Sequence, residues 1–422
     1  VKKFRKFSGS AVNWRKCSGF WHGDWDAKPS IFENVNWVTT PVKYLGIPLE
    51  NYCDSDPYWR GQDVDLREKT EKWKERDLSM FARATVCNLF FVCKLWYVLQ
   101  VLHCSRINVQ RLHRVFAVFI WESTWERTSR TNLFRRVRAG GLSLAHLFLR
   151  QFLNRFIFVR DVNEPFLRTV CQVRLASSLP GVVVSSVREW EGGIYGYFRE
   201  VVQATRFLCT RFSLEYMSGV SRKQLYRDVA DVVLPVPLYR SLYVSGKWQD
   251  VLQRVKKMTV PPSVKTFFFK LHTGALPVKT WMEDKGLFVP WGVNCLLCRK
   301  PETVEHVFLD CWDGIFFWDV LQRTLKKELP LDPQGVRYLS IENDTCVPYD
   351  LVMLLGLHSI WKSRMAVRHA EVDARPVSDY LCVSLRSVIE AWKAQECCPD
   401  WVPVLEEALP LKLFNYVYVV FV

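Results

Sequence analysis

Apolar residues recur at every third or fourth position over long stretches of this chain, a spacing that predicts helices with one buried face. The first clear stretch begins near Asp63, and its apolar positions are Trp73, Leu78, Phe81, Val86, Leu89 and Phe90. A second set follows at Leu112, Val115, Phe116 and Phe119. The same pattern returns over residues 350 to 395, so we expect a predominantly α-helical protein.

The first 50 residues differ from the rest. Short β-prone runs at 35–40 and 42–45 lie on either side of Pro41, which predicts two short strands. We therefore expect a small α+β region at the N-terminus. Farther along, Gly140-Gly141 interrupts the helical pattern and predicts a turn.

One strongly apolar run is a poor candidate for a membrane segment. Leu89 to Leu102 is interrupted by Lys94 and Gln100, whereas a membrane-spanning helix needs about 20 apolar residues. We expect a buried core helix and no membrane partner. The sequence does not begin with an apolar leader, and most of its 14 cysteines stand singly in apolar stretches. Reduced thiols and an intracellular location, in nucleus and cytoplasm, are expected.

The chain is basic, with 58 Lys and Arg against 43 Asp and Glu and a net charge of +15. Most of the surplus lies between Phe81 and Arg160, which contain 13 basic residues and only two acidic ones. The guanidinium group can donate two hydrogen bonds to one phosphate, so this segment predicts a nucleic-acid surface. The alternative is that these arginines stack on aromatic rings or solvate their helices. The candidate residues are Arg83, Lys94, Arg111, Arg114, Arg127, Arg130, Arg135, Arg136 and Arg138.

Four possible metal ligands follow the spacing Cys295-x2-Cys298-x7-His306-x4-Cys311. A Cys-x-x-Cys turn directs two thiolates toward one point, and the later His and Cys complete a tetrahedron around Zn²⁺. Four protein ligands leave no open coordination position, so this zinc would be structural rather than hydrolytic. The alternative is four unrelated residues in a cysteine-rich chain.

Further motifs surround these ligands. Phe268 to His272 and Pro277 precede them, Glu302 to Phe308 contains the histidine, and Trp318 follows Cys311. Together they resemble the zinc-binding region of non-LTR (LINE-type) retrotransposon reverse transcriptases.

Motifs nearer the N-terminus agree with this resemblance and occur in the family's order. Phe7-Ser8-Gly9 with Asn13 to Cys17 is similar to the motif that follows the catalytic aspartates, and Lys43 to Ile47 is similar to the Tyr-Leu-Gly strand that closes the palm. Trp73 to Arg83 and Gly140-Gly141-Leu142 resemble parts of the thumb.

The resemblance implies five regions. Residues 1–50 would end a reverse-transcriptase palm, 51–160 would form a helical, Arg-rich thumb, and 161–255 a connecting helical region. A zinc-binding domain at 256–330 and a helical C-terminal region at 331–422 would follow. The implied function is RNA-directed DNA polymerisation in target-primed reverse transcription. The implied partners are an RNA template, a DNA target or an RNA–DNA duplex, and the upstream palm and fingers of the same polyprotein.

The polymerase reaction needs Asp carboxylates that hold two Mg²⁺ ions. In this family an Asp-Asp pair precedes the Ser-Gly motif, and the present sequence contains no Asp-Asp pair. We therefore assign no catalytic residue, expect Mg²⁺ only in the full-length enzyme, and expect this C-terminal fragment to be inactive alone. The alternative is a stand-alone zinc-dependent module that binds nucleic acid or protein. An Asp-Asp hairpin encoded upstream of Val1 would favour the polymerase, and its absence would favour the module.

Overall fold

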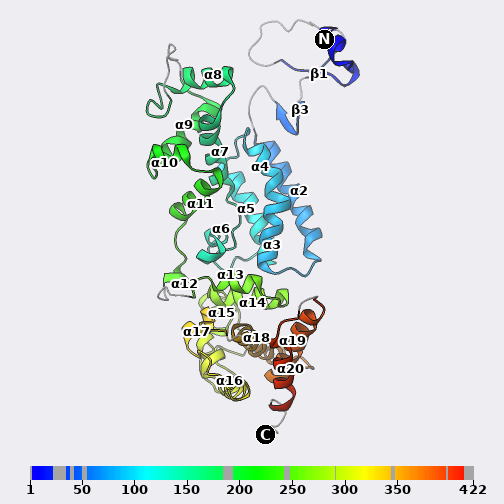
Figure 1. Ribbon diagram of the computed structural model, residues 1–422, viewed down its shortest axis with the longest axis vertical. Coiled ribbons are helices and arrows are strands. Elements are labelled where there is room, and N and C mark those ends of the chain that lie inside the picture. Colours follow the sequence, from blue (N-terminus) through cyan, green and yellow to red (C-terminus); the bar gives the residue numbers. More distant parts are fainter. Residues whose placement is uncertain are drawn as a thin grey trace. The chain divides into compact units, whose positions relative to one another are not determined.

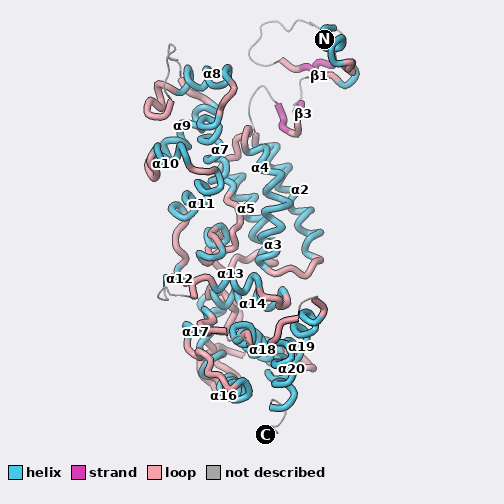
Figure 2. Tube along the Cα trace, viewed as in Figure 1, coloured by secondary structure: helices cyan, strands magenta, loops and turns pink. Residues whose placement is uncertain are grey.

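Helices account for most of the residues that the computed structural model describes, and strands occur only near the N-terminus of that part (Figure 1; Figure 2). The described residues are 2–21, 35–38, 42–49, 55–183, 193–241, 248–289, 291–343, 347–395 and 398–412. The expected fold class, predominantly α with a small α+β region, is confirmed.

The N-terminal strands form two small pairs. β1 (Ser18–Gly19) is parallel to β2 (Asn36–Trp37), and β3 (Val42–Tyr44) is antiparallel to β4 (Ile47–Leu49). The turn between β3 and β4 has two successive residues with positive φ, the second of them a glycine. Both predicted β-prone runs thus contain a strand. The end of the first run and the proline between the runs lie outside the described residues.

The chain divides into two compact units, and each unit is assembled from separate stretches of sequence. The first unit comprises Val1–Trp73, Asn88–Phe116 and Ala145–Val229, and the second comprises Lys74–Cys87, Ala117–Leu144 and Ala230–Val422. The five regions implied by the family resemblance follow sequence order, so they divide the chain differently and stay predictions.

In the first unit, α7 packs against α4 and α9. The helices that lie wholly or mostly in this unit are α1 (Lys2–Ser8), η1 (Trp14–Lys16), α2 (Asp56–Lys74), η2 (Cys87–Val92), α4 (Cys93–Leu99), α5 (Arg106–Trp121), α7 (Leu147–Asp161), α8 (Pro165–Leu175), α9 (Gly196–Cys209), α10 (Leu214–Gly219) and α11 (Arg222–Val233). The apolar set predicted from Leu112 to Phe119 is buried on α5, as its spacing requires.

Arg155 on α7 is almost wholly buried, and it satisfies the C-terminal end of α4. Its guanidinium donates to the carbonyl oxygens of Leu99 and Gln100 at 2.9 and 2.8 Å and to that of Leu102 at 3.2 Å. It also pairs with Glu200 on α9 at 2.9 Å. The last carbonyls of a helix have no partner within that helix, so this arginine satisfies them and links three helices.

In the second unit, α18 packs against both α14 and α19 and is buried over most of its length. The helices that lie in this unit are α3 (Met80–Val86), α6 (Thr131–Phe134), η3 (Val137–Ala139), α12 (Leu238–Ser241), α13 (Val251–Lys257), α14 (Pro262–His272), α15 (Lys279–Asp284), η4 (His306–Asp310), α16 (Trp312–Leu325), α17 (Pro333–Tyr338), α18 (Tyr349–Arg368), α19 (Val377–Lys393) and α20 (Trp401–Lys412). The helical segment predicted for residues 350 to 395 is thus present as α18 and α19.

The apolar run of the sequence lies in a continuous helical stretch, Met80–Leu99, which includes the π-helical turn η2. Leu89 and Phe90 are 62% and 49% exposed, although the apolar spacing predicted both as buried. A π turn contains one residue more than an α turn, so it rotates the following residues to another face. By length and composition alone this stretch could cross a membrane, and half of it is buried inside the structure.

The predicted turn at Gly140-Gly141 is present and requires its second glycine. Gly140 has a φ of +90°, and the N–H of Gly141 donates to the carbonyl oxygen of Arg136 at 3.0 Å. A Cβ atom on Gly141 would lie 2.2 Å from the carbonyl oxygen of Arg135 and 2.4 Å from that of Asn132. Only a residue without a side chain allows the backbone to approach itself this closely.

Candidate metal centre and basic surface

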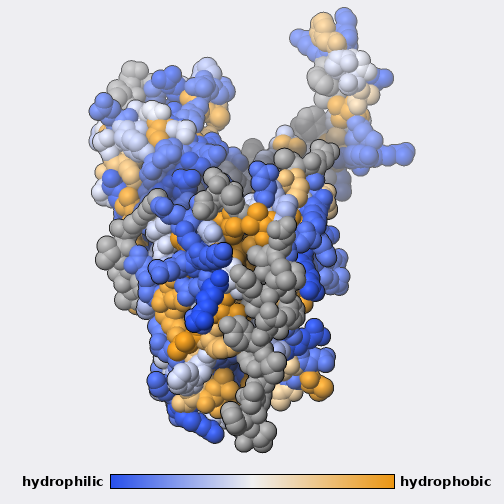
Figure 3. All heavy atoms as spheres, turned by 60° about the horizontal axis from the view of Figure 1, so that its bottom comes forward, coloured by the Kyte–Doolittle hydropathy of each residue, from blue (hydrophilic) through white to orange (hydrophobic). Residues whose placement is uncertain are grey.

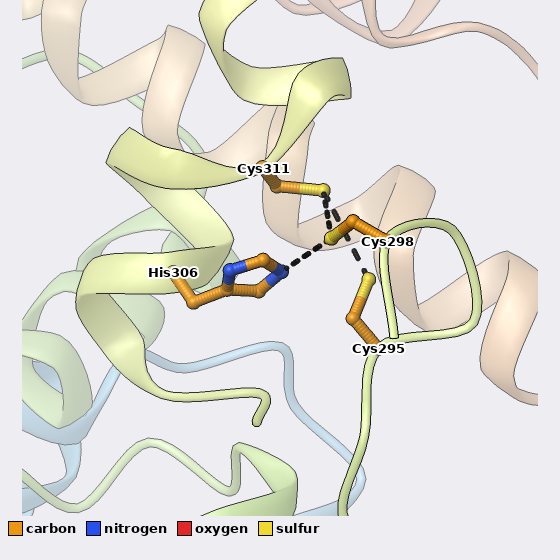
Figure 4. Close-up of side chains that lie close together, drawn as sticks. All are labelled: Cys295, Cys298, His306 and Cys311. Carbon is orange, nitrogen blue, oxygen red and sulfur yellow. Dashed lines mark hydrogen bonds between the residues drawn. The ribbon is translucent and has the colours of Figure 1, made fainter. Parts of the chain in front are cut away.

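Four side chains from one short stretch of sequence come together in the second unit (Figure 4). They are Cys295, Cys298, His306 and Cys311, and their ligand atoms all lie within 4.8 Å of one another. Cys295, His306 and Cys311 are buried, and Cys298 is half-buried. The cluster is therefore closed from solvent on most sides.

The first pair of cysteines lies on a tight reversal of the chain. An isolated bridge joins Asn294 to Pro301, and the Cys295 N–H donates to the carbonyl oxygen of Lys300 at 2.8 Å. Arg299 has a φ of +61° and donates its N–H to the carbonyl oxygen of Cys295 at 3.1 Å. This left-handed residue closes the turn, and both sulfurs point to the same side (Figure 4).

The second pair comes from the junction of two helices. His306 begins the π turn η4, Cys311 precedes the first residue of α16, and the Cys311 N–H donates to the carbonyl oxygen of His306 at 2.8 Å. The indole N–H of Trp318 on α16 donates to the carbonyl oxygen of Phe308 at 2.8 Å. The buried indole thus holds the π turn against α16. The turn itself brings the His306 imidazole close to the Cys311 sulfur.

Arg364 on α18 contacts two sulfurs of the cluster. Its Nη1 donates to the sulfur of Cys295 at 3.1 Å and its Nη2 donates to the sulfur of Cys311 at 3.0 Å. Burial lowers the pKa of this guanidinium, but the two sulfurs beside it raise that pKa above its usual value. A buried cation that donates to two sulfurs favours their thiolate forms.

The thiol pKa values reflect the crowding of three sulfurs. Burial raises the pKa of Cys295, but the backbone N–H of Cys298, the His306 ring, the backbone N–H of Leu297 and the Arg364 charge lower it to about 6. At Cys298, burial and the neighbouring sulfurs of Cys295 and Cys311 raise the pKa to about 11. The first thiolate therefore opposes ionisation of the next one, and a divalent cation would allow all three to ionise.

The residues fit a zinc ion. In a tetrahedral site with Zn–S bonds of about 2.3 Å, neighbouring sulfurs lie about 3.8 Å apart. The sulfur of Cys311 lies 3.9 Å from that of Cys295 and 3.9 Å from that of Cys298. Three sulfurs and one imidazole, with no oxygen donor, suit Zn²⁺ and not Mg²⁺ or Ca²⁺. Three thiolates and one Zn²⁺ carry a net charge of −1, which the charge of Arg364 balances.

Two further buried cations support the same region, and sequence reasoning identified neither of them. Arg368 forms a buried ion pair with Glu302, the residue that follows the first turn by one position, and also donates to the carbonyl oxygen of Pro277 at 2.8 Å. Lys279, 1% exposed, donates to the carbonyl oxygen of Asn294 at 2.8 Å. The one available signal was the spacing of Arg364 and Arg368, which places both on one face of a helix that is otherwise strongly apolar.

The arginines predicted to bind nucleic acid do not share one environment, and two of them are buried. Arg83 is 4% exposed and pairs with Glu122, and Arg135 is 8% exposed and donates to the carbonyl oxygens of Leu234 and Pro235. Their guanidinium groups hold the second unit together, so we remove both from the predicted phosphate-binding set. A buried arginine with protein partners is not available to solvent phosphates.

The remaining candidates are nearer the surface. Arg130 pairs with Glu126 and Arg136 pairs with Asp231, so each shares its charge with an acid. Lys94 is exposed, and the neighbouring Lys69 ammonium lowers its pKa. The other exposed or half-buried candidates are Arg111, Arg114, Arg127 and Arg138. A nucleic-acid surface would therefore use only part of the predicted set.

Comparison with known proteins gives two matches. Residues 237–318 match the family described as zinc-binding in reverse transcriptase. All four clustered ligands lie within that range, and Arg364 lies beyond it. The chain is also 27% identical over 165 residues to the transposon TX1 uncharacterized 149 kDa protein of Xenopus laevis. That alignment covers 36% of this chain and 12% of the relative, so the chain spans a small part of the relative's length. The matched zinc-binding region and the similarity to a transposon protein both support the resemblance to the C-terminal side of a non-LTR retrotransposon reverse transcriptase.

Proposed function

We propose that the chain binds the template RNA and the target DNA of target-primed reverse transcription, as part of an RNA-directed DNA polymerase. The relation to reverse transcriptases and the net charge of +15 both support this function. The observation that carries it is an exposed helix face with arginines and no acids, on α5.

Helix α5 contains three arginines, Arg106, Arg111 and Arg114, and no Asp or Glu. Arg106 and Arg111 are exposed, and neither makes a hydrogen bond or ion pair within the part of the chain that the structure describes. They are five positions apart, which separates them by about 140° around the helix axis. The 65% exposed Ile107 lies between them, so the three residues cover a broad exposed side of α5. Such a face can contact successive phosphates without reading sequence, which suits a protein that moves along a template.

We also propose that Cys295, Cys298, His306 and Cys311 bind one structural Zn²⁺. The bound ion would supply a cross-link between the first turn and the start of α16, with no open coordination position. Arg364 would then balance the charge of the three thiolates and orient two of them.

The surface of the zinc-binding region offers a second contact area for nucleic acid. Phe288, Trp291 and Trp312 are 84%, 79% and 72% exposed, and Arg299 and Lys300 are exposed in the first turn. Apolar side chains reach the molecular surface among hydrophilic ones (Figure 3). Exposed aromatic rings and cations are both typical of surfaces on which unpaired bases stack.

A salt titration of binding tests the nucleic-acid function. We expect Arg106→Glu with Arg111→Glu to weaken binding to an RNA–DNA duplex and to two unrelated single strands alike. The log–log salt slope should become flatter by about 0.7 to 0.9 for each lost phosphate contact. The control reverses Arg323 and Lys393, two exposed cations on α16 and α19, and changes the net charge by the same amount. Equal weakening by both double variants would show that net charge alone drives binding and would remove α5 as the surface.

A stand-alone zinc-dependent module is the second candidate, because the 422 residues contain no Asp-Asp pair. Sequencing the reading frame upstream of Val1 separates the two candidates. A catalytic Asp-Asp hairpin there supports the polymerase, and an unrelated upstream sequence supports the module. Primer extension by this chain alone would contradict both.

A further inference from the structure

A cavity of about 380 Å³ opens within the second unit, where four segments that are distant in sequence converge. Its walls come from α3, from the loop after α5, from α14 and its following loop, and from α18. This volume lies within the range of roughly 300 to 1,000 Å³ that is usual for small-ligand sites. The four ligands of the metal centre do not line this cavity.

The cavity has more positive charge than its acids neutralise. Three cations line it, and one of them, Arg83, is paired with Glu122. The remaining acid, Asp77, is exposed and precedes α3. Glu122, already paired with Arg83, lies near enough to Lys270 to raise its pKa. Neither Lys270 nor Arg127 forms an ion pair of its own among the described residues, so both can contact a ligand.

Neither of these two cations has its hydrogen-bonding capacity satisfied. The ammonium of the half-buried Lys270 makes no hydrogen bond or ion pair within the described residues. The Nη1 of Arg127 is buried without an acceptor. The Arg127 guanidinium lies over the Trp281 ring, 5.8 Å from its centroid, which holds the side chain without using its N–H groups. A buried donor without an acceptor destabilises a fold, so a ligand that brings an acceptor to Arg127 would gain a hydrogen bond there.

The pKa values agree with this geometry. Burial, followed by the charge of Arg127, lowers the pKa of Lys270 to about 8, and burial also lowers the pKa of Arg127. A group whose charged form is disfavoured by its surroundings gains most from a bound anion.

Another part of the cavity lining is aromatic and apolar. Phe267 on α14 stacks on Trp361 of α18 with ring centroids 6.3 Å apart and an interplanar angle of 28°. His358 lies one turn before Trp361, and its ring centroid is 5.3 Å from that of Phe267. The buried Nδ1 of His358 has no hydrogen-bond partner among the described residues. Met365 completes this wall. The cavity thus combines an anion-binding side, a flat apolar side and one unused polar ring atom.

We propose that this Lys270 cavity binds one nucleotide of a single-stranded RNA or DNA, with the phosphate on Lys270 and Arg127 and the base against the Phe267–Trp361 wall. A phosphate accepts hydrogen bonds from both cations, and a base has a flat face for the aromatic wall and a polar edge for His358. The inference rests on the proposed nucleic-acid function and names a specific site for it, separate from the face of α5.

Two matched variants on α14 test the site in the full zinc-loaded chain. Lys270→Met removes the unpartnered cation, and Lys265→Met makes the same chemical change at a residue that does not line the cavity. The probe is a 5′-phosphorylated pentathymidylate, measured by fluorescence anisotropy. We expect Lys270→Met to weaken binding about tenfold or more, as for loss of one hydrogen bond to a charged group. Lys265→Met should leave the affinity within about twofold, because its ammonium instead donates to the Lys256 carbonyl oxygen at 3.0 Å.

The melting temperature gives a second readout. Lys270→Met should melt no lower than the wild-type chain, because it removes a charge that desolvation disfavours and that forms no ion pair among the described residues. A structural lysine would behave oppositely, so a clear fall in the melting temperature of Lys270→Met would overturn the proposal. Equal loss of binding in both variants would overturn it as well, since that result indicates general electrostatics.

Photo-cross-linking locates the base. With 5-bromouracil replacing the central thymine, we expect adducts on the peptides that contain Phe267 or Trp361, and thymidine monophosphate should suppress them better than inorganic phosphate does. Equal suppression by phosphate would reduce the cavity to an anion site. If the strand bound through α5 without these adducts and without any effect of Lys270→Met, only the cavity proposal would fail. If the wild-type chain bound no strand, the proposed function would fail too.

Discussion

The zinc-ligand segment, residues 294–312, and the Arg-rich segment, residues 81–160, differ in what fixes their charged groups. In the first, two short turns bring together all four ligands that the spacing predicted. In the second, neighbours in sequence have unlike environments: Arg135 is buried against backbone carbonyls, and Arg136 is exposed and pairs with Asp231. Ligand geometry follows from local chain geometry, whereas the role of an arginine depends on which distant segment covers it.

Of the changes that test this difference, loss of the metal should have the largest effect on folding. A structural zinc contributes apparent binding free energy on the order of 10 kcal/mol that is also local folding free energy. We therefore expect Cys298→Ser or His306→Ala to abolish stoichiometric zinc and to expose residues 261–320 to protease. Elemental analysis and limited proteolysis measure both effects. Cys209→Ser, the same change at an exposed cysteine outside the cluster, is the control. Much less than one zinc per wild-type chain would contradict the site.

Removal of a buried arginine should have the next largest effect. Arg155→Met leaves Glu200 and several carbonyl oxygens at the end of α4 without their donor, so we expect a loss of about 3 to 5 kcal/mol in the free energy of unfolding. Arg111→Met, the same change at an exposed arginine, should lie within about 0.5 kcal/mol of the wild type. Denaturant titration measures both. Similar losses would show that burial does not separate the two kinds of arginine.

The turn that positions Arg135 and Arg136 gives a third test. Gly141→Ala places a methyl group against two carbonyl oxygens, and we expect destabilisation of about 3 kcal/mol, the upper end for an overpacked site. Gly61→Ala is the matched control, because Gly61 lies within α2 and a Cβ there meets nothing within 4 Å. That variant should be more stable than the wild type by about 0.4 to 1 kcal/mol. A harmless Gly141→Ala would show that the turn can open without loss of packing.

The half-buried His146 differs from a buried arginine because its side chain can lose its proton. Burial lowers the pKa of His146 to about 4, below the value of about 6.5 expected in the unfolded chain. The unfolded state therefore binds the extra proton first, and the contribution of His146 to stability is complete above pH 6.5 and lost as the pH falls toward 4. We expect this loss to be about 1 to 2 kcal/mol, measured as the difference in free energy of unfolding between pH 7 and pH 4.5.

The variant His146→Asn isolates this effect. The Nδ1 of His146 accepts from the Leu149 N–H at 3.3 Å at the start of α7, and an asparagine oxygen can accept the same bond. The variant should keep its stability at pH 7 and lose less of it at pH 4.5 than the wild-type chain does. An unchanged pH dependence would assign the acid sensitivity to other groups.

The sequence predicted elements better than it predicted environments. The helical spacing at Leu112 to Phe119 and over 350 to 395 corresponds to buried faces, because a helix determines which residues share a side. Leu89 and Phe90 are exposed because a π turn, which leaves no clear signal in a single sequence, rotates the helix face. The Gly140-Gly141 break predicted a turn, but the close backbone approach at Gly141 becomes visible only when the loop is folded.

The sequence by itself determined the helical class of this protein, the basic surplus and the four zinc-ligand candidates, because periodicity, charge and short ligand spacing act over a few turns of chain. Only the tertiary structure brought Arg364 from α18 onto two sulfurs, and only it buried Arg83 and Arg135. It also placed Lys270 and Arg127 in one cavity without an ion pair among the described residues. These outcomes depend on contacts between residues dozens to nearly 200 positions apart. Whether a charge is exposed, paired or unpartnered is set by burial, and burial is a property of the packed chain.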